Sequence, residues 1–353
     1  MRKRIAVVGA GAVGGYVGAG LAAGGHDVVL IDPWPAHVEA IRAHGMNLTG
    51  MTEAERRTVK VNAMHLTEAQ SLAKQKPIDI AFISVKSYDT VWATRLISQY
   101  LAANGCVVSM QNCINEAAVA GVVGWGRTLG CIVTGGVGVD LYEPGHIRRG
   151  YAKRPEVTSF YIGEPHGIIS KRAEEIAEIM SCVDTAKATD NLWGERWTKL
   201  CINGMRNGVS AATGMGGNAR DQHDAVRRVC IKLGGEAVRV GQKLGYNLGK
   251  VGVLDPEQLA LASEGQAKAL AGIEAQLLAS ANDSTRSAYQ RPSMAQDMEK
   301  RRRTEIEFMN GFIASEGANA GVPAPTHEML TRQVLRVERG EIPARPENVL
   351  VNA

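Results

Sequence analysis

Short apolar runs alternate with amphipathic segments along the first half of the chain. The runs have the length of buried strands, and the segments between them carry apolar residues at helical spacing. Strands that alternate with helices in this way predict a parallel sheet with helices on both faces. Strands are predicted at 5–8, 27–31, 79–85, 106–110, 128–134, 137–147 (with a turn at Pro144-Gly145) and 156–163, and helices at 12–23, 36–43, 67–74, 88–103, 116–123 and 170–182.

The pattern changes at about residue 189, after which only helical periodicity is found. A chain of 353 residues has room for about two domains. We therefore expect an α/β domain at 1–188, an all-helical domain at 189–340 and a tail at 341–353, which contains two prolines. In the second domain, helices are predicted at 191–212, 224–244, 256–279, 294–318 and 326–337, with a loop at Asn282-Asp283-Ser284.

The composition is that of a globular chain. Apolar residues make up 45% and charged residues 22%, which suits a sizeable core and argues against disorder. The net charge of +4 is small and spread out, so it gives no support to a nucleic-acid partner. The six cysteines form no CxxC pair and have no histidine at ligand spacing. We therefore expect no metal site and no disulfide framework, but reduced and mostly buried thiols.

The N-terminus carries a second possible interpretation. Residues 2–4 are basic and are followed by twenty uncharged residues, 6–25, as in a signal peptide or a membrane span. Eight of those twenty are glycines, which suit a turn motif better than a spanning helix. No other stretch is long enough to span a bilayer, so we expect a cytoplasmic protein without a membrane partner.

A glycine motif, Gly9-Ala10-Gly11-Ala12-Val13-Gly14, lies between the first predicted strand and the first predicted helix. In a dinucleotide-binding turn of this form, the first glycine permits the tight turn and the second lets the backbone approach a pyrophosphate. The third lets helix and strand pack closely, and the helix N-terminus binds the phosphates. A glycine-rich turn that only packs closely is the alternative. The motif predicts a Rossmann-type domain with candidate cofactor-binding residues Gly9, Gly11, Ala12, Val13 and Gly14.

Asp32 ends the second predicted strand, 18 residues after Gly14. A carboxylate here accepts hydrogen bonds from the ribose hydroxyls of NAD and repels the 2′-phosphate of NADP, so NADH is favoured. Arg42 and Lys86 are candidate partners for a 2′-phosphate, which keeps NADPH open. Alternatively, Asp32 only opens the turn with Pro33.

Lys199, Asn203 and Asn207 are each four residues apart, so on one continuous helix they form a stripe on one face. A cation and two amides in an apolar setting can hold a polar substrate. A solvated helix face is the alternative. Further along, Glu305 shares a predicted apolar face with Met298 and Met309, where an unpartnered carboxylate would be costly.

Ser293 and Asn112 are two further candidate site residues. Ser293 precedes the Glu305 segment, and Asn112 follows the strand at 106–110. Ligands of open α/β sheets bind beyond the carboxyl ends of the strands, so Asn112 is well placed for a nicotinamide or a carbonyl. The alternatives are that Glu305 makes a surface ion pair with Arg301 and that Asn112 is an ordinary turn residue.

Together these residues resemble the ketopantoate reductase family (2-dehydropantoate 2-reductases) nearly from end to end. The resemblance implies a Rossmann-type domain followed by a helical domain like the C-terminal domain of 6-phosphogluconate dehydrogenase, with the active site in the cleft between them. It is carried by GAGAVGG at 9–15, SVKSYDT at 84–90, QNC at 111–113, WTKLCIN at 197–203 with Asn207, and PSMAQDMEKRRRTEIEFMNGF at 292–312.

The resemblance implies NAD(P)H-dependent reduction of a small-molecule 2-oxo acid, in the family ketopantoate to pantoate, and we expect a homodimer. Lys199 corresponds to the family's general acid, and Glu305 corresponds to a glutamate that helps to hold the substrate. The pocket residues implied are Asn112, Asn203, Asn207 and Ser293, and Lys86 and Asn112 are candidate cofactor contacts.

Four features depart from the family pattern. Asn112-Cys113 replaces Asn-Gly, Gln290 replaces an asparagine three residues before Ser293, the stretch at about 250–285 is longer, and Asp32 is unusual because typical members use NADPH. The first two departures concern the substrate pocket, so they leave open which 2-oxo acid is the substrate. An NAD-dependent D-2-hydroxyacid dehydrogenase on the same fold is one alternative. The other is a non-catalytic dinucleotide-binding protein, which would tolerate loss of Lys199 and Glu305.

Overall fold

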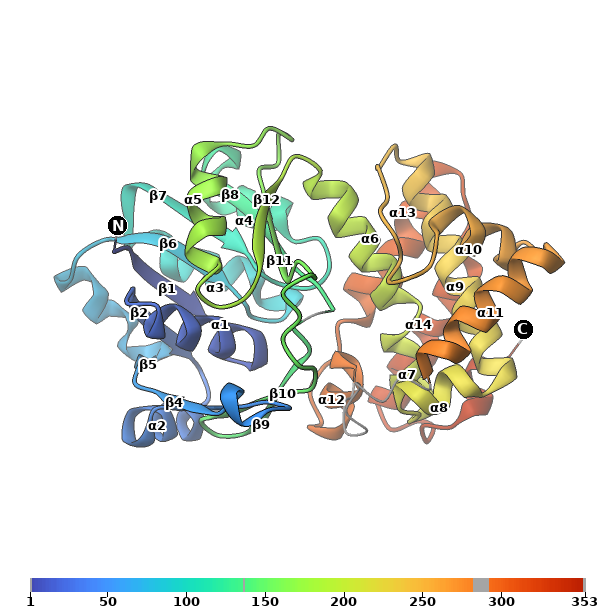
Figure 1. Cartoon of the computed structure of the whole chain (residues 1–353), viewed down its shortest axis with the longest axis horizontal. Coiled ribbons are helices and arrows are strands. Elements are labelled where there is room, and N and C mark those ends of the chain that lie inside the picture. Colours follow the sequence, from blue (N-terminus) through green and yellow to red (C-terminus); the bar gives the residue numbers. More distant parts are fainter. Residues whose placement is uncertain (1, 136, 282–291, 352–353) are drawn as a thin grey trace. The chain divides into compact units, whose positions relative to one another are not determined.

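The structure is a computed structural model of the 353-residue chain, and it describes residues 2–135, 137–281 and 292–351. The chain divides into two compact units, Met1–Leu192 and Trp193–Ala353. The first unit is built on strands and the second on helices, as the sequence predicts (Figure 1).

The first unit contains an eight-stranded sheet in the order β12-β11-β8-β7-β6-β1-β2-β5. All neighbouring pairs are parallel except β8 with β11, so the predicted parallel sheet is confirmed, with one antiparallel pair. The strands are β1 Arg4–Val8, β2 Asp27–Asp32, β5 Asn62–His65, β6 Ile78–Ile83, β7 Leu101–Ser109, β8 Thr128–Val133, β11 Phe160–Gly163 and β12 Ala186–Thr189.

Helices cover both faces of this sheet. Two of the predicted helices, α1 and α4, have the predicted bounds, whereas the helix predicted at 88–103 ends at Ser98 and gives way to β7. The α-helices are α1 Ala12–Ala23, α2 Pro35–His44, α3 Thr90–Ser98, α4 Glu116–Val123 and α5 Lys171–Met180. Short 3-10 helices are η1 Glu53–Glu55, η2 Leu66–Lys74, η3 Ser87–Asp89 and η4 Trp125–Arg127.

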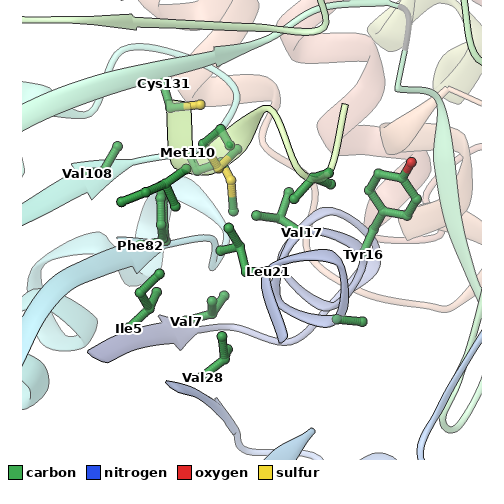
Figure 2. Packing of buried hydrophobic residues seen from close by; sticks show 14 of the residues in the cluster. Ile5, Val7, Tyr16, Val17, Leu21, Val28, Phe82, Val108, Met110 and Cys131 are labelled. Carbon is green, nitrogen blue, oxygen red and sulfur yellow. The ribbon is translucent and has the colours of Figure 1, made fainter. Parts of the chain in front are cut away.

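Alternate residues of the strands point to opposite faces and so build two cores. Ile5 and Val7 of β1 face Val17 and Leu21 of α1, together with Phe82 of β6 (Figure 2). Ala6 and Val8 belong to the other core, which includes residues of α3 and α4. Because both faces are buried, the strands are continuous apolar runs, and this is why the sequence pattern identified them.

A second, four-stranded sheet in the order β4-β3-β10-β9 packs on α1. A side chain on Gly15 of α1 would collide with Ile147, because its Cβ would lie 2.6 Å from Ile147 Cδ1. The hairpin with its turn at Pro144-Gly145 was predicted, but β3, β4, β5 and β12 were not. The strands of the second sheet are β3 Met46–Thr49, β4 Arg57–Val59, β9 Val139–Glu143 and β10 His146–Arg149.

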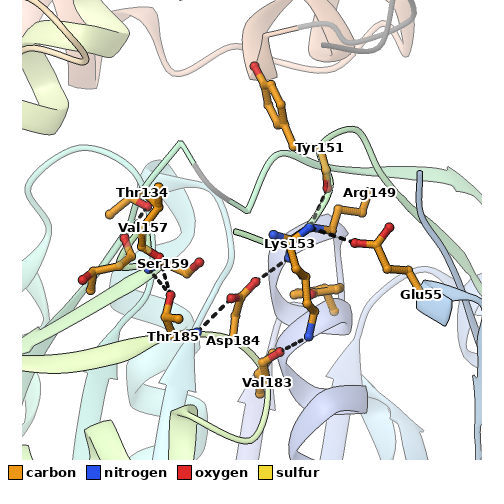
Figure 3. Close-up of polar contacts among 12 residues, drawn as sticks. Glu55, Thr134, Arg149, Tyr151, Lys153, Val157, Ser159, Val183, Asp184 and Thr185 are labelled. Carbon is orange, nitrogen blue, oxygen red and sulfur yellow. Dashed lines mark hydrogen bonds and ion pairs between the residues drawn. The ribbon is translucent and has the colours of Figure 1, made fainter. Parts of the chain in front are cut away.

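Arg149, at the end of β10, connects the second sheet to α1 and to the turn before β12 (Figure 3). Its Nη1 donates to Asp184 Oδ2 at 2.6 Å and to Tyr16 Oη at 2.7 Å, and its Nε donates to Tyr151 O at 2.8 Å. Arg149 and Asp184 are both buried. Losing either one would leave a buried charge without its nearest partner. Through the bond to Tyr16, Arg149 also holds the helix that follows the glycine turn.

The second unit consists of helices around the long helix α9, against which α8, α10, α13 and α14 pack. The indole of Trp197 lies under Gly241 of α9, where a Cβ would come within 2.3 Å of it, and donates to Ala237 O at 2.8 Å. The helices are α6 Leu192–Gly204, α7 Asn207–Thr213, α8 Gly217–Gln222, α9 Asp224–Lys243, α10 Pro256–Ser263, α11 Ala267–Ala281, α12 Ser293–Glu299, α13 Phe312–Ala320 and α14 Pro325–Glu338, with a π-helical turn η5 at Glu307–Gly311 and a 3-10 helix η6 at Pro346–Val349.

Several long helices predicted in this unit are interrupted. The helix predicted at 191–212 breaks between Gly204 and Asn207, and the one predicted at 294–318 breaks after Glu299 and resumes in η5. The helix predicted at 256–279 is likewise divided into α10 and α11. Helical periodicity continues across such breaks, so the sequence pattern does not reveal them. The predicted loop at 282–284 lies outside the described residues.

The segment expected as a tail after residue 340 is packed instead. Arg345 N donates to Ala212 O at 3.1 Å, and Asn348 Nδ2 donates to the same carbonyl at 2.9 Å. Val349 is buried, so the expectation of a loose tail was wrong for these residues. All six cysteines are free thiols, and Cys182 alone of the six is exposed. Among the described residues, no helix has both the length and the apolar character needed to cross a bilayer.

Candidate active site

The glycine motif forms the turn between β1 and α1 as predicted. Gly9 adopts a φ of +95°, and its N–H donates to Ile31 O at 2.8 Å. A Cβ on Gly14 would lie 2.0 Å from Gly9 O, whereas a Cβ on Gly11 would meet nothing within 4 Å. Gly9 and Gly14 are therefore required by the protein's own backbone. Gly11 instead faces open space, as a residue approached by a ligand should.

Asp32, at the end of β2, is buried beside this turn. Its Oδ2 accepts from Ala10 N at 2.8 Å, and its Oδ1 accepts from Trp34 N at 2.9 Å. The carboxylate thus orders the glycine turn and at the same time supplies negative charge at the position where a ribose would bind. Arg42, the predicted alternative partner for a phosphate, is already paired with Glu39 and Glu68.

His37 of α2, which was not among the residues predicted from the sequence, also holds the glycine turn. The side chain is fully buried, with Nε2 2.8 Å from Ala10 O, and its Nδ1 accepts from Gly145 N at 2.9 Å. Since Nδ1 accepts, Nε2 carries the proton and donates to Ala10 O. His37 therefore connects the turn of the β9–β10 hairpin to the cofactor turn.

Lys86 and Asn112 lie in loops at the carboxyl ends of the adjacent strands β6 and β7. Gln111 joins the two loops, because its Nε2 donates to Val85 O at 2.9 Å and to Thr90 Oγ1 at 2.8 Å. Asn115 Nδ2 donates to Asn112 O at 2.8 Å. Since β6 is also next to β1, these loops and the glycine turn share one edge of the sheet, where ligands of open α/β sheets bind.

Cys113, one of the departures from the family pattern, has a φ of +64°. Glycine adopts this left-handed conformation without penalty, and a side chain costs about 1–2 kcal/mol there. The backbone of this loop therefore keeps the form that suits Asn-Gly, although the chain carries Asn-Cys.

Lys199 lies on α6, one turn before Asn203, and is partly exposed, whereas Asn203 is buried. Burial of the ammonium, with a smaller effect of the Arg206 guanidinium, lowers the pKa of Lys199 to about 8. In the part of the chain that the structure describes, no carboxylate acts on it in the opposite sense. Such a lysine can give up and regain a proton near neutral pH.

The continuous stripe predicted for Lys199, Asn203 and Asn207 is wrong in detail, because Asn207 begins the separate helix α7. Asn207 is buried, and α7 packs on α12, whose first residue is Ser293. Gln290 lies outside the described residues.

Glu305 is buried, with 3% of its surface exposed, so the alternative of a surface ion pair is wrong. It precedes η5, not a helix continuous with α12, and therefore does not share a helical face with Met298 as predicted. The next residue, Ile306, approaches α7, since its Cδ1 would lie 2.9 Å from a Cβ on Gly208. The segment containing Glu305 thus packs against the helix that begins at Asn207.

No group of three or more histidine, cysteine, aspartate or glutamate side chains that could hold a metal ion is found over residues 2–135, 137–281 and 292–351. The candidate residues therefore form two sets, one in each unit. The first set carries the features of a dinucleotide site, and the second combines a lysine of lowered pKa with buried amides and a buried carboxylate.

Comparison with known families assigns both units. Residues 5–160 match the profile described as ketopantoate reductase PanE/ApbA, and residues 191–338 match the profile of its C-terminal domain. The chain belongs to the ketopantoate reductase family. It is an oxidoreductase that uses NAD(P)H and acts on a CH–OH group.

Individual relatives are similar over nearly the whole chain. A 2-dehydropantoate 2-reductase of Archaeoglobus fulgidus is 28% identical, over 96% of this chain and 99% of its own. The crystal structure of a PanE/ApbA family ketopantoate reductase from Ralstonia eutropha JMP134 superposes with a TM-score of 0.74 at 26% identity, over 96% of this chain and 99% of its own. A D-mandelate dehydrogenase bound to NADH and anilino(oxo)acetate has the same fold, with a TM-score of 0.77 at 22% identity, over 96% of this chain and 98% of its own.

Proposed function

We propose that the protein reduces the C2 carbonyl of a 2-oxo acid with hydride from nicotinamide C4, and that ketopantoate is the substrate. The lowered pKa of the Lys199 ammonium, on a helix that also presents buried Asn203, supports this most directly. Whole-length similarity to a 2-dehydropantoate 2-reductase supports the choice of substrate. The test is the loss of NADH or NADPH absorbance with ketopantoate and a panel of other 2-oxo acids, ketopantoate being expected to give the highest kcat/KM.

In this proposal the cofactor supplies the hydride and the protein supplies position and charge. Gly9, Gly11, Ala12, Val13 and Gly14 bind the pyrophosphate, and Asp32, Lys86 and Asn112 complete the cofactor site. Lys199 protonates the developing alkoxide, while Asn203, Asn207 and Ser293 bind the carboxylate and hydroxyl groups of the substrate. Glu305 holds the substrate by a hydrogen bond. The homodimer remains a prediction, which sedimentation equilibrium tests.

NAD-dependent oxidation of a D-2-hydroxy acid, with NADH-dependent reduction of the corresponding 2-oxo acid as its reverse, is the second candidate function. Asp32 favours it, because a carboxylate in the ribose position suits NADH. It is also the activity named for the D-mandelate dehydrogenase with the same fold. A higher kcat/KM for phenylglyoxylate than for ketopantoate would support this second function over the first.

The kcat/KM is expected to be at least several-fold higher with NADH than with NADPH. A 2′-phosphate beside the Asp32 carboxylate should cost on the order of 1–3 kcal/mol, and Arg42 is occupied by Glu39 and Glu68. In Asp32→Asn the gap between the cofactors should narrow, because the charge is removed with little change of shape. Equal or better use of NADPH by the unmodified protein would contradict this prediction and direct attention to Lys86.

Glu305→Gln is expected to lower kcat/KM by about 10–100-fold. A hydrogen bond to a charged group contributes about 1.5–3 kcal/mol, and losing it corresponds to a change of this size. The melting temperature should change little, since glutamine keeps the volume of the side chain. Glu307→Gln is the matched control, because Glu307 is exposed and only two residues away. A variant that loses melting temperature but keeps its kinetics would show that Glu305 is structural.

A further inference from the structure

A buried polar pair connects the two segments of the helical unit that carry Lys199 and Glu305. It consists of Asn310, in the π-helical turn η5, and His327, in α14, and neither side chain has exposed surface. Asn310 Nδ2 lies 2.8 Å from Gly204 O and 2.9 Å from His327 Nδ1. His327 Nε2 lies 2.8 Å from Leu233 O, on α9. Side chains from two segments thus meet the last residue of the Lys199 helix.

The direction of each hydrogen bond follows from the groups involved. Leu233 O can only accept, so His327 Nε2 carries the proton, and burial keeps the imidazole neutral by lowering its pKa to about 4. His327 Nδ1 is then an acceptor, and Asn310 Nδ2 must donate to it. The second hydrogen of Nδ2 is directed to Gly204 O. Both amide hydrogens of Asn310 are therefore used, which fixes its orientation.

The hydrogen bonds of Asn310 and His327 matter because they reach Gly204, at the end of the helix that carries Lys199. Gly204 ends α6, five residues after Lys199 and directly after Asn203. The last carbonyls of a helix have no partner within the helix, and Asn310 supplies one here. The approach is close, since a Cβ on Gly204 would lie 2.9 Å from Ile313 Cδ1 and 3.2 Å from His327 Cε1.

Stability alone accounts poorly for an amide at this position. Asn310 Oδ1 is buried and has no hydrogen-bond partner among the residues that the structure describes. An unsatisfied buried acceptor is destabilising, because it loses its hydrogen bonds to water on folding and gains none in return. The turn that carries Asn310 is also π-helical, a form that is rare and frequent at functional sites. The amide nitrogen of Asn310 therefore makes two hydrogen bonds, whereas burial of the amide oxygen lowers the stability of the folded state.

We propose that Asn310 and His327 are positioning residues, which lock the end of the Lys199 helix to the turn that follows Glu305. This inference rests on the proposed function, because it assigns both segments to one reaction. Asn310 acts on Lys199 through the Gly204 carbonyl, and its own turn, η5, begins two residues after Glu305. Without the link, the last turn of α6 would fray, the Lys199 ammonium would become more hydrated, and its distance from the substrate carbonyl would vary.

Three variants separate positioning from stability. Asn310→Ala removes the link to Gly204 directly. His327→Gln keeps a donor for Leu233 O but places no acceptor at the Nδ1 position, so Asn310 is no longer held. His327→Asn is the matched control, because its Oδ1 replaces Nδ1 as the acceptor for Asn310 while the bond to Leu233 is lost. The two His327 variants each lose one hydrogen bond and should lose similar melting temperatures. They also keep the test usable if Asn310→Ala does not fold.

The experiment measures kcat, KM and cofactor Kd, and also the rate at which Lys199 reacts with acetic anhydride as a function of pH, read by mass spectrometry. Asn310→Ala and His327→Gln are expected to lower kcat by about 10–100-fold, as a displacement of about 1 Å does, with cofactor Kd within about twofold. In both, the midpoint of Lys199 labelling should rise from about 8 towards the ordinary value of 10.5. His327→Asn should keep both kcat and the midpoint near those of the unmodified protein.

The proposal would be overturned if all variants had the same kinetics as the unmodified protein. It would also be overturned if His327→Gln and His327→Asn lost kcat equally and in proportion to their loss of melting temperature. A Lys199 midpoint that stays at its original value in Asn310→Ala or His327→Gln would overturn it as well. The labelling result does not depend on the substrate. If the unmodified protein reduced no 2-oxo acid, the proposed function would fail, while a shifted midpoint would still show that the pair positions Lys199.

Discussion

Lys199→Ala is expected to lower kcat for reduction by about 10²–10⁴-fold, the usual contribution of a positioned acid. An ammonium near the carbonyl both stabilises the alkoxide that forms and donates the proton to it. Cofactor Kd, measured by fluorescence titration, should stay nearly unchanged because the glycine turn lies in the other unit. A kcat within about threefold of the unmodified protein, a loss of less than about 0.7 kcal/mol, would rule out Lys199 as the essential acid.

Lys199→Met tests the same role without removing the volume of the side chain, and it should raise the melting temperature while abolishing most activity. Burial lowers the pKa of Lys199 to about 8, below the ordinary value of 10.5, so the charged form destabilises the folded state. The gain from methionine should be complete below pH 8 and should fade as the pH approaches 10.5. The exposed Lys232→Met is the control and should change neither stability nor kcat.

The pH profile gives an independent check on Lys199. Reduction needs the protonated amine, so kcat/KM for the 2-oxo acid should fall as the pH rises through about 8. Oxidation of the hydroxy acid needs the neutral amine, so its kcat/KM should rise through the same pH. Profiles of the same sign in both directions would contradict the assignment, and in Lys199→Met both inflections should disappear.

The fold of the first unit was largely predictable because its strands are buried on both faces and therefore read as apolar runs. The missed strands lack this signal. Residues 57–59 and 62–65 carry mostly exposed or half-buried side chains, and their position depends on pairing with distant strands. In the second unit, the break at Gly204 is associated with a contact to Asn310, which is 106 residues away. A local window of sequence contains no trace of that contact.

The same distinction applies to the candidate site. The glycine turn and Asp32 were predicted because their chemistry is encoded in neighbouring residues. Lys199 and Glu305 were suggested by patterns that assumed continuous helices, and those helices are interrupted in the structure. Their roles as general acid and substrate-binding residue came from the resemblance to the family. His37, Asn310 and His327 were missed, because an isolated histidine or asparagine acquires meaning only from partners that folding brings to it. In the structure these residues are recognised because each is a buried polar side chain whose hydrogen bonds go to backbone groups or to another buried side chain.

Gly11→Ala is expected to weaken cofactor binding by about 10–100-fold, or about 1.4–2.7 kcal/mol, without loss of melting temperature. The backbone at Gly11 has a φ of −59° and a ψ of −163°, which is not the left-handed conformation that favours glycine, and the added Cβ would meet no protein atom within 4 Å. The space that it fills is where the pyrophosphate approaches the turn. Gly11→Val should weaken binding further, again with an unchanged fold.

Gly14→Ala provides the contrast, because its Cβ would lie 2.0 Å from Gly9 O and 3.0 Å from Ser84 Cβ. Real atoms cannot approach so closely, so α1 must move away from β1 and the melting temperature should fall sharply, whether or not cofactor is present. Thermal unfolding with and without NADH, together with cofactor titration of each folded variant, distinguishes the two effects. If Gly11→Ala bound NADH as tightly as the unmodified protein, the pyrophosphate would not lie over this turn. If Gly14→Ala kept its melting temperature, the close contact of α1 with the glycine turn would be absent in solution.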